Sequence, residues 1–61
     1  MSWDDLKIYE AVALAADVLG VEPHRTTVST RGALVVVCFC DRAGSVLGTY
    51  TVSESGEVTE E

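Results

Sequence analysis

The stretch from Ala33 to Ser53, ALVVVCFCDRAGSVLGTYTVS, decides the fold. Two runs rich in β-branched and aromatic residues flank Asp41-Arg42-Ala43-Gly44, which is typical of a type I turn with Gly in the left-handed position of a G1 bulge. Ser29-Thr30-Arg31-Gly32 and Ser53-Glu54-Ser55-Gly56 repeat this turn chemistry. The turns predict an antiparallel meander of four strands, at about residues 26–29, 33–41, 45–53 and 57–60.

This turn type also gives an expected register for the strands. The apolar residues that it brings to one face pair as follows: Val28 with Leu34, Leu34 with Val52, Val52 with Val58, Val36 with Tyr50, Cys38 with Gly48 and Cys40 with Val46. Because turn type and hydrophobic phase agree on this face, we expect a helix to cover it.

A helical pattern over about residues 3–19 precedes the strands. Ser2 is a suitable N-cap with Asp5 three residues later, and Gly20 is a suitable left-handed C-terminal cap. Pro23 in the connector prevents continuation of the helix. At 100° per residue, the apolar side chains on one wide face are Ile8, Ala11, Val12, Ala15, Ala16 and Leu19. The sequence therefore predicts one α+β domain, residues 1–61, with an N-terminal helix packed on a four-stranded antiparallel β-meander.

The second face of the expected sheet is also apolar. It carries Val35, Val37, Phe39 and Leu47, and one helix can cover only one side of such a sheet. Exposed apolar patches usually mark interfaces, so we expect a second copy or another protein to cover this face. A homodimer is the simplest arrangement, because a two-fold contact needs only one self-complementary patch.

Composition and charge exclude several classes of protein. The chain has 61 residues, of which 48% are hydrophobic, and a net charge of −6. A phosphate-binding surface needs clustered Lys and Arg, so we expect neither direct nucleic-acid binding nor membrane binding. No apolar run reaches the roughly 18 residues of a membrane span, and acids stand at the N-terminus where a signal peptide has bases. We expect a soluble, cytoplasmic protein.

The chain contains few residues suited to catalysis or to cofactor binding. Cys38 and Cys40 point the same way on a strand with parallel Cβ vectors, which disfavours a disulfide and favours reduced, buried thiols. A metal site completed by His24 would lack the four ligands that zinc prefers. No nucleophile or base accompanies His24, and the glycines are explained by turns, a helix cap and one strand position. We expect no enzyme activity, no cofactor and no metal.

Charge placement is the remaining functional signal, because two acidic segments flank a slightly basic middle. The acids that we expect to contact a basic protein partner are Glu10, Asp17, Glu54, Glu57, Glu60 and Glu61. Candidate apolar contacts beside them are Trp3, Leu6 and Leu14, although Trp3 has a structural alternative in folding back over the sheet edge. The alternative for the acids is a solvated surface that keeps a small apolar protein soluble.

Two resemblances bear on function. Tyr50-Thr51-Val52-Ser53-Glu54-Ser55-Gly56-Glu57-Val58 resembles the final hairpin of PepSY-type domains, which implies a structural or interaction module that binds a polypeptide or self-assembles through its exposed sheet face. In size, acidity and α+β make-up, the whole chain is similar to small phage-encoded inhibitors, namely anti-CRISPR proteins and other nucleic-acid mimics. This second resemblance has no residue motif. It implies an inhibitor that acts in the host cytoplasm by occupying a basic nucleic-acid-binding surface.

Overall fold

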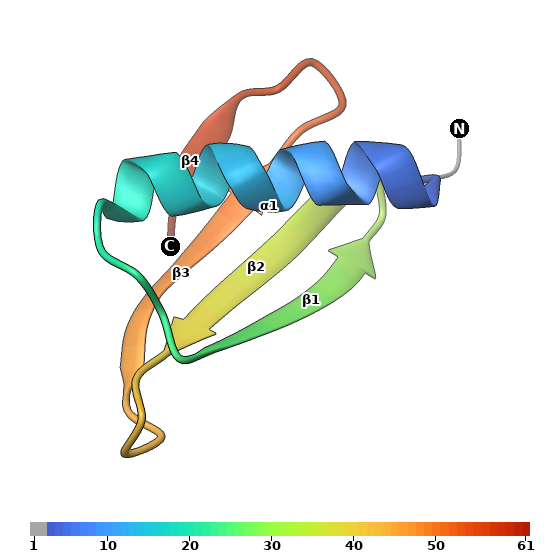
Figure 1. Ribbon diagram of the computed structural model, residues 1–61. Helices are drawn as coiled ribbons and strands as arrows, with labels where there is room; N and C mark the ends of the chain where they lie inside the picture. The colour runs from blue at the N-terminus through green and yellow to red at the C-terminus, as the bar shows by residue number, and fades with distance from the viewer. Residues whose placement is uncertain (1–2) are drawn as a thin grey trace.

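The computed structural model describes residues 3–61, which form one helix followed by four strands (Figure 1). The elements are α1 (Asp5–Leu19), β1 (Arg25–Arg31), β2 (Leu34–Cys40), β3 (Val46–Val52) and β4 (Val58–Glu60). The strands lie in the order β1-β2-β3-β4, and each pairs antiparallel with the next. The predicted α+β meander is therefore confirmed.

The helix is capped at both ends by its own sequence. Ser2, the expected N-cap, lies outside the described residues. Asp4 takes this position instead, with extended backbone angles and a side chain that accepts a hydrogen bond from the Lys7 backbone N–H at 2.8 Å. The helix consequently begins at Asp5 rather than at residue 3. At its other end Gly20 has a φ of 78° and donates its N–H to the Ala16 carbonyl, as predicted.

Two of the three hairpins have the predicted turn. Gly44 and Gly56 have φ values of 90° and 92°, and their N–H groups donate to the carbonyls of Asp41 and Ser53. The first hairpin differs, because β1 and β2 stay paired up to Arg31 and the residues between the strands form a two-residue loop. Gly32 is the first residue of that loop, with a φ of 60°, which matches a type II′ turn. The first strand is therefore longer than residues 26–29.

A one-residue bulge changes the register of the central hairpin. Cys40 pairs with Val46 as predicted, but the next pair is Phe39 with Gly48, so that Leu47 is the extra residue on β3. Beyond the bulge, the pairs are Cys38↔Thr49, Val37↔Tyr50, Val36↔Thr51 and Val35↔Val52. In this part of the hairpin, each predicted β2 partner is one residue too early: Val52, for example, pairs with Val35 instead of Leu34. The predicted register of β1 is also wrong, because Val28 pairs with Val37 instead of Leu34. The predicted pairing of Val52 with Val58 is confirmed.

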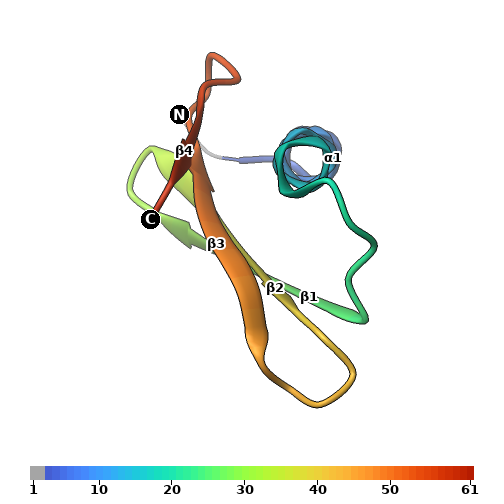
Figure 2. The same cartoon turned by 90° about the vertical axis from the view of Figure 1, so that its left-hand side faces the viewer.

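The shift in register exchanges the two faces of β2. Val35, Val37 and Phe39, which we expected to form a partner face, are fully buried and cluster with Ala11 and Ala15 of α1. Figure 2 shows α1 lying over one side of the sheet. Only Leu47, at the bulge, keeps substantial exposure. We call the side toward α1 the inner face and the opposite side the outer face. The residues predicted for the core lie half-buried on the outer face of β2: Leu34, Val36, Cys38 and Cys40.

The core lies between the inner face and an alanine-rich side of the helix. Ala11 and Ala15 are buried, and their small side chains allow α1 to lie close to the sheet. The rings of Phe39 and Tyr50 pack with their centroids 6.0 Å apart. Gly48 leaves room for this pair, because a Cβ there would lie 3.0 Å from the Tyr50 ring. The partly buried residues around this core are Trp3, Ile8, Val12, Ala16, Leu19 and Val58.

Within the described residues, α1 has 15 residues, and no helix is long and apolar enough to cross a membrane.

A matched pair of substitutions distinguishes the observed register from the predicted one. Val37→Thr places a hydroxyl among buried apolar side chains, whereas Val36→Thr places the same group on the half-exposed outer face. We expect Val37→Thr to lower the free energy of unfolding in urea by about 1–3 kcal/mol, and Val36→Thr to change it much less. A larger loss for Val36→Thr would contradict the observed register.

Candidate partner-binding surface

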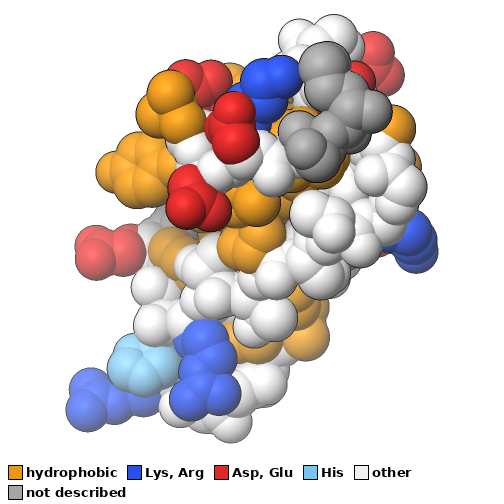
Figure 3. Space-filling model, turned by 90° about the vertical axis from the view of Figure 1, so that its right-hand side faces the viewer, with side chains coloured by type: hydrophobic (Ala, Val, Ile, Leu, Met, Phe, Trp, Pro, Cys, Tyr) orange, Lys and Arg blue, Asp and Glu red, His pale blue; other side chains and the backbone are white. Residues whose placement is uncertain are grey.

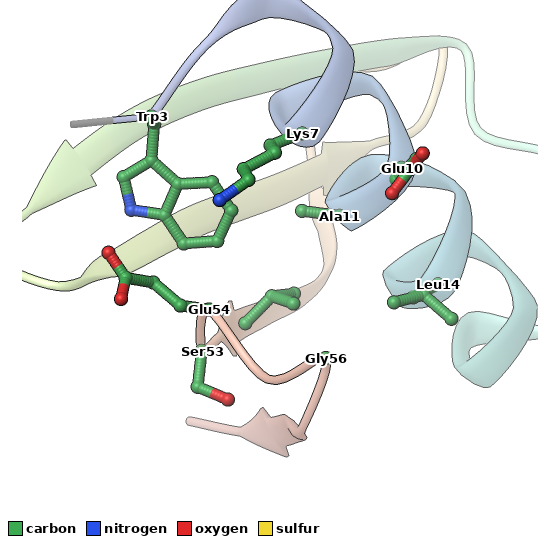
Figure 4. A pocket seen from close by; sticks show the side chains of 9 residues that line it. Trp3, Lys7, Glu10, Ala11, Leu14, Ser53, Glu54 and Gly56 are labelled. Atoms are coloured by element: carbon green, nitrogen blue, oxygen red, sulfur yellow. The ribbon is translucent and has the colours of Figure 1, made fainter. Parts of the chain in front are cut away.

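A small pocket lies between α1 and the β3–β4 hairpin and brings together four predicted partner-binding residues: Trp3, Glu10, Leu14 and Glu54 (Figure 4). The pocket has a volume of about 100 Å³ and is open to solvent. Lys7 also lines it. Two carboxylates, one ammonium group and two large apolar side chains therefore meet at one place on the surface.

Helical spacing explains how the α1 side of this pocket forms. Residues 7, 10 and 14 are separated by three and four positions, which places their side chains along one stripe of the helix. The turn from Ser53 to Gly56 supplies the opposite wall. That turn lies against Leu14, since a Cβ at Gly56 would be 3.7 Å from Leu14 Cδ1. Lys7 is not among the contacts predicted from the sequence, although this helical spacing could have revealed it.

Trp3 serves the core as well as the pocket. Its indole is half-buried and packs against the core cluster. The indole Nε1 is buried and has no hydrogen-bond acceptor among residues 3–61. Figure 4 shows the side chain of Glu54 pointing toward Trp3, with Lys7 beside the indole ring. Only part of the indole is accessible to a partner.

The other predicted contacts do not line the pocket. Leu6 and Asp17 are exposed on α1, with Leu6 at 69% of its full exposure. Glu57 precedes β4, and Glu60 pairs with Tyr50 in the strand register, which assigns its side chain to the inner face. The carboxylate of Glu61 already forms an ion pair within the chain, because its Oε1 lies 3.1 Å from an Arg31 guanidinium nitrogen.

Basic side chains gather at the opposite end of the molecule. Figure 3 shows most Asp and Glu side chains over the upper part of this surface, with Lys or Arg side chains also there and at the right, and Lys or Arg side chains beside His at the lower end. A second hollow, of about 220 Å³, lies at that end and is lined by His24, Arg25, Asp41 and Arg42, with Cys40 beside them. The charge of the molecule is therefore polarised: the acidic pocket between α1 and the β3–β4 hairpin lies apart from this arginine-rich end.

The two thiols lie on the outer face rather than in the core. Cys38 and Cys40 are free and half-buried, and Cys38 Sγ accepts a hydrogen bond from Thr49 Oγ1 at 3.8 Å. Their expected burial is wrong, because the bulge turns Phe39 inward instead. Desolvation raises the pKa of Cys40 above its usual value, and a hydrogen bond and repulsion from Cys38 raise it further.

Within the part of the chain that the structure describes, no three His, Cys, Asp or Glu side chains are grouped closely enough to hold a metal ion. Comparisons with protein-family models, with curated proteins and with solved structures find no match to this chain.

The position of the thiols predicts their reactivity. Because both thiols are half-buried, we expect both to react with iodoacetamide in the folded protein, but more slowly than after denaturation. The thiolate is the reactive form, and the raised pKa of Cys40 favours its protonated thiol, which slows its reaction further. Cys38→Ala removes two of the causes of that raised pKa, so Cys40 should be alkylated faster at pH 8 in this variant, as measured by mass spectrometry. Protection of both thiols until denaturant is added would instead indicate a core position.

Proposed function

We propose that this chain is a non-enzymatic inhibitor that binds a basic surface of another protein through the pocket between α1 and the β3–β4 hairpin. Its carboxylates would take the place of nucleic-acid phosphates, in the manner of an acidic nucleic-acid mimic of anti-CRISPR type. The target would be a defence or DNA-handling complex whose basic surface normally holds nucleic acid.

The observation that carries this proposal is the meeting of Glu10 and Glu54 at one pocket with Leu14. The two carboxylates come from distant parts of the sequence, and the fold brings them to one side of the molecule. Exposed apolar groups beside them, Leu14 and Leu6, provide the contacts that affinity requires, because binding energy concentrates in a few desolvated side chains. Charge supplies the attraction and the apolar groups hold the complex together.

The polarised charge also favours one orientation of approach. A basic target attracts the side with Glu10 and Glu54 and repels the end with Arg25 and Arg42. Such complementarity accelerates association at low salt, and added salt weakens it. A carboxylate surface that served only solubility would show no such preference for one side of the molecule.

Competition with nucleic acid tests the proposal. A fluorescent oligonucleotide is bound to each member of a panel of purified CRISPR effector complexes and other basic DNA-binding proteins, and the chain is added at increasing concentration. We expect displacement from at least one target, measured by fluorescence anisotropy, with an apparent affinity that falls as salt is raised from 50 to 300 mM.

Single charge reversals locate the binding side. Glu10→Lys and Glu54→Lys should each weaken displacement on the order of tenfold. Glu22→Lys is the matched control, because Glu22 is exposed in the connector and outside the pocket, so the same change of charge should have little effect. All three variants should keep nearly the wild-type thermal stability, since exposed charges contribute little to folding. Equal weakening by all three, or displacement from no member of the panel, would contradict the proposal.

A further inference from the structure

β1 is an open edge of the sheet with unusual features for an edge strand. All seven of its residues are exposed, it pairs with β2 on one side only, and its register with β2 has no bulge. Proteins usually protect such edges with short strands, central charges, prolines or bulges, because unpaired backbone groups recruit further strands. β1 has none of these between Arg25 and Arg31, where only Thr, Val and Ser occur.

The other edge of the sheet is protected in the usual way. β4 has three residues, carries Glu60, and is flanked by Glu57 and Glu61. The two edges therefore differ in length and in charge. Among residues 3–61, only β1 provides a long, regular and centrally uncharged strand edge.

Within the part of the chain that the structure describes, the side of β1 away from β2 has a regular row of backbone groups with no strand partner. N–H and C=O groups alternate between the two sides of an antiparallel strand, and the pair that closes a two-residue hairpin loop is a hydrogen-bonded pair. That pair is Arg31 with Leu34, so the backbone groups of Thr30, Val28 and Thr26 point away from β2. An incoming strand would find alternating donors and acceptors along this row.

The two arginines indicate the chemistry of that strand. Arg25 and Arg31 pair with Cys40 and Leu34 and therefore share the outer face. They are six residues apart, which corresponds to roughly 20 Å along a strand. An antiparallel strand that pairs with β1 would place two of its own residues, also six apart, opposite these guanidinium groups. Acidic side chains at both positions complement them.

A second copy of this chain fits the edge less well. Antiparallel pairing of two β1 strands centred on Val28 would place Arg25 of each copy opposite Arg31 of the other, and like charges directly opposite each other destabilise a strand pair. The net charge of −6 on each chain adds to this repulsion.

We infer that β1 binds an extended segment of another polypeptide by strand addition, and that this segment has Asp or Glu six residues apart on either side of uncharged, β-prone residues. Main-chain hydrogen bonds to Thr26, Val28 and Thr30 hold the segment, and the arginines select its charge. The acid opposite Arg31 replaces Glu61, whose present ion pair is largely exposed. β1 is the edge of the sheet opposite β4, and no β1 residue lines the pocket between α1 and the β3–β4 hairpin, so this site stands independently of the proposed inhibitor function.

Synthetic peptides test the inference in the full chain. The probe is acetyl-Glu-Thr-Val-Thr-Val-Thr-Glu-amide, and the control has Lys at both ends. In ¹⁵N spectra the Glu peptide should shift the amide signals of Thr26, Val28 and Thr30 and slow their hydrogen exchange, whereas the Lys peptide should bind on the order of tenfold more weakly. Shifts confined to the outer face or to β4, or no binding at millimolar peptide, would overturn the inference. Concentration-dependent oligomers without peptide would identify a second copy as the occupant and would also overturn it.

Variants separate the backbone contribution from the charge contribution. Val28→Pro removes an outward N–H at an edge position that tolerates proline, and it should abolish binding, whereas Val28→Ala keeps the N–H and should retain it. Arg25→Glu combined with Arg31→Glu should reverse the preference toward the Lys peptide, which gives a second readout should Val28→Pro unfold. An unchanged preference in this double variant would overturn the charge argument. Neither change touches Glu10 or Glu54, so oligonucleotide displacement should persist in each of these variants that remains folded.

Discussion

The bulge at Leu47 determines which side chains of the central hairpin lie under the helix. β2 is apolar on both faces, so two arrangements compete for the same helix: one buries Leu34, Val36 and the thiols, and the other buries Val35, Val37 and Phe39. Tyr50 points toward α1 in both arrangements. The bulge selects the second arrangement, which buries the whole Phe39 ring instead of two cysteines. Aromatic side chains bury more apolar area than thiols, and this difference favours the observed fold.

The other features of the core follow from this choice. With Phe39 turned inward, Gly48 lies directly opposite it, and the absent side chain leaves room for the Tyr50 ring. The alanines of α1 then allow the helix to lie close above the pair. The outer face retains smaller or more polar groups: Thr49 and both thiols are half-buried, and Thr51 is buried with its hydroxyl 3.4 Å from the Thr59 carbonyl oxygen. Both the pocket beside α1 and the open edge of β1 depend on this layered arrangement.

Much of the fold could be predicted from the sequence because its helix cap and turn residues are distinctive. Gly20, Gly44 and Gly56 all adopt the left-handed backbone that their positions suggested. The register could not be predicted in the same way, because a turn fixes pairing only as far as the next irregularity. An isolated glycine within a strand often accompanies a bulge, so Gly48 was a signal of the shift. The position of Glu10 and Glu54 at one pocket could not be predicted from the sequence either, because it depends on where the last hairpin packs against α1.

The most direct test of this account is a measurement of nuclear Overhauser effects between α1 and β2 in the isotopically labelled protein. The account predicts strong contacts from the methyl groups of Ala11 and Ala15 to side chains of the inner face, including Val37 and the Phe39 ring, and none to Val36 or Cys38. Contacts from these alanines to Val36 and Cys38, with the Phe39 ring free of the helix, would contradict it. They would show that the hairpin lacks the bulge and that the opposite face of β2 forms the core.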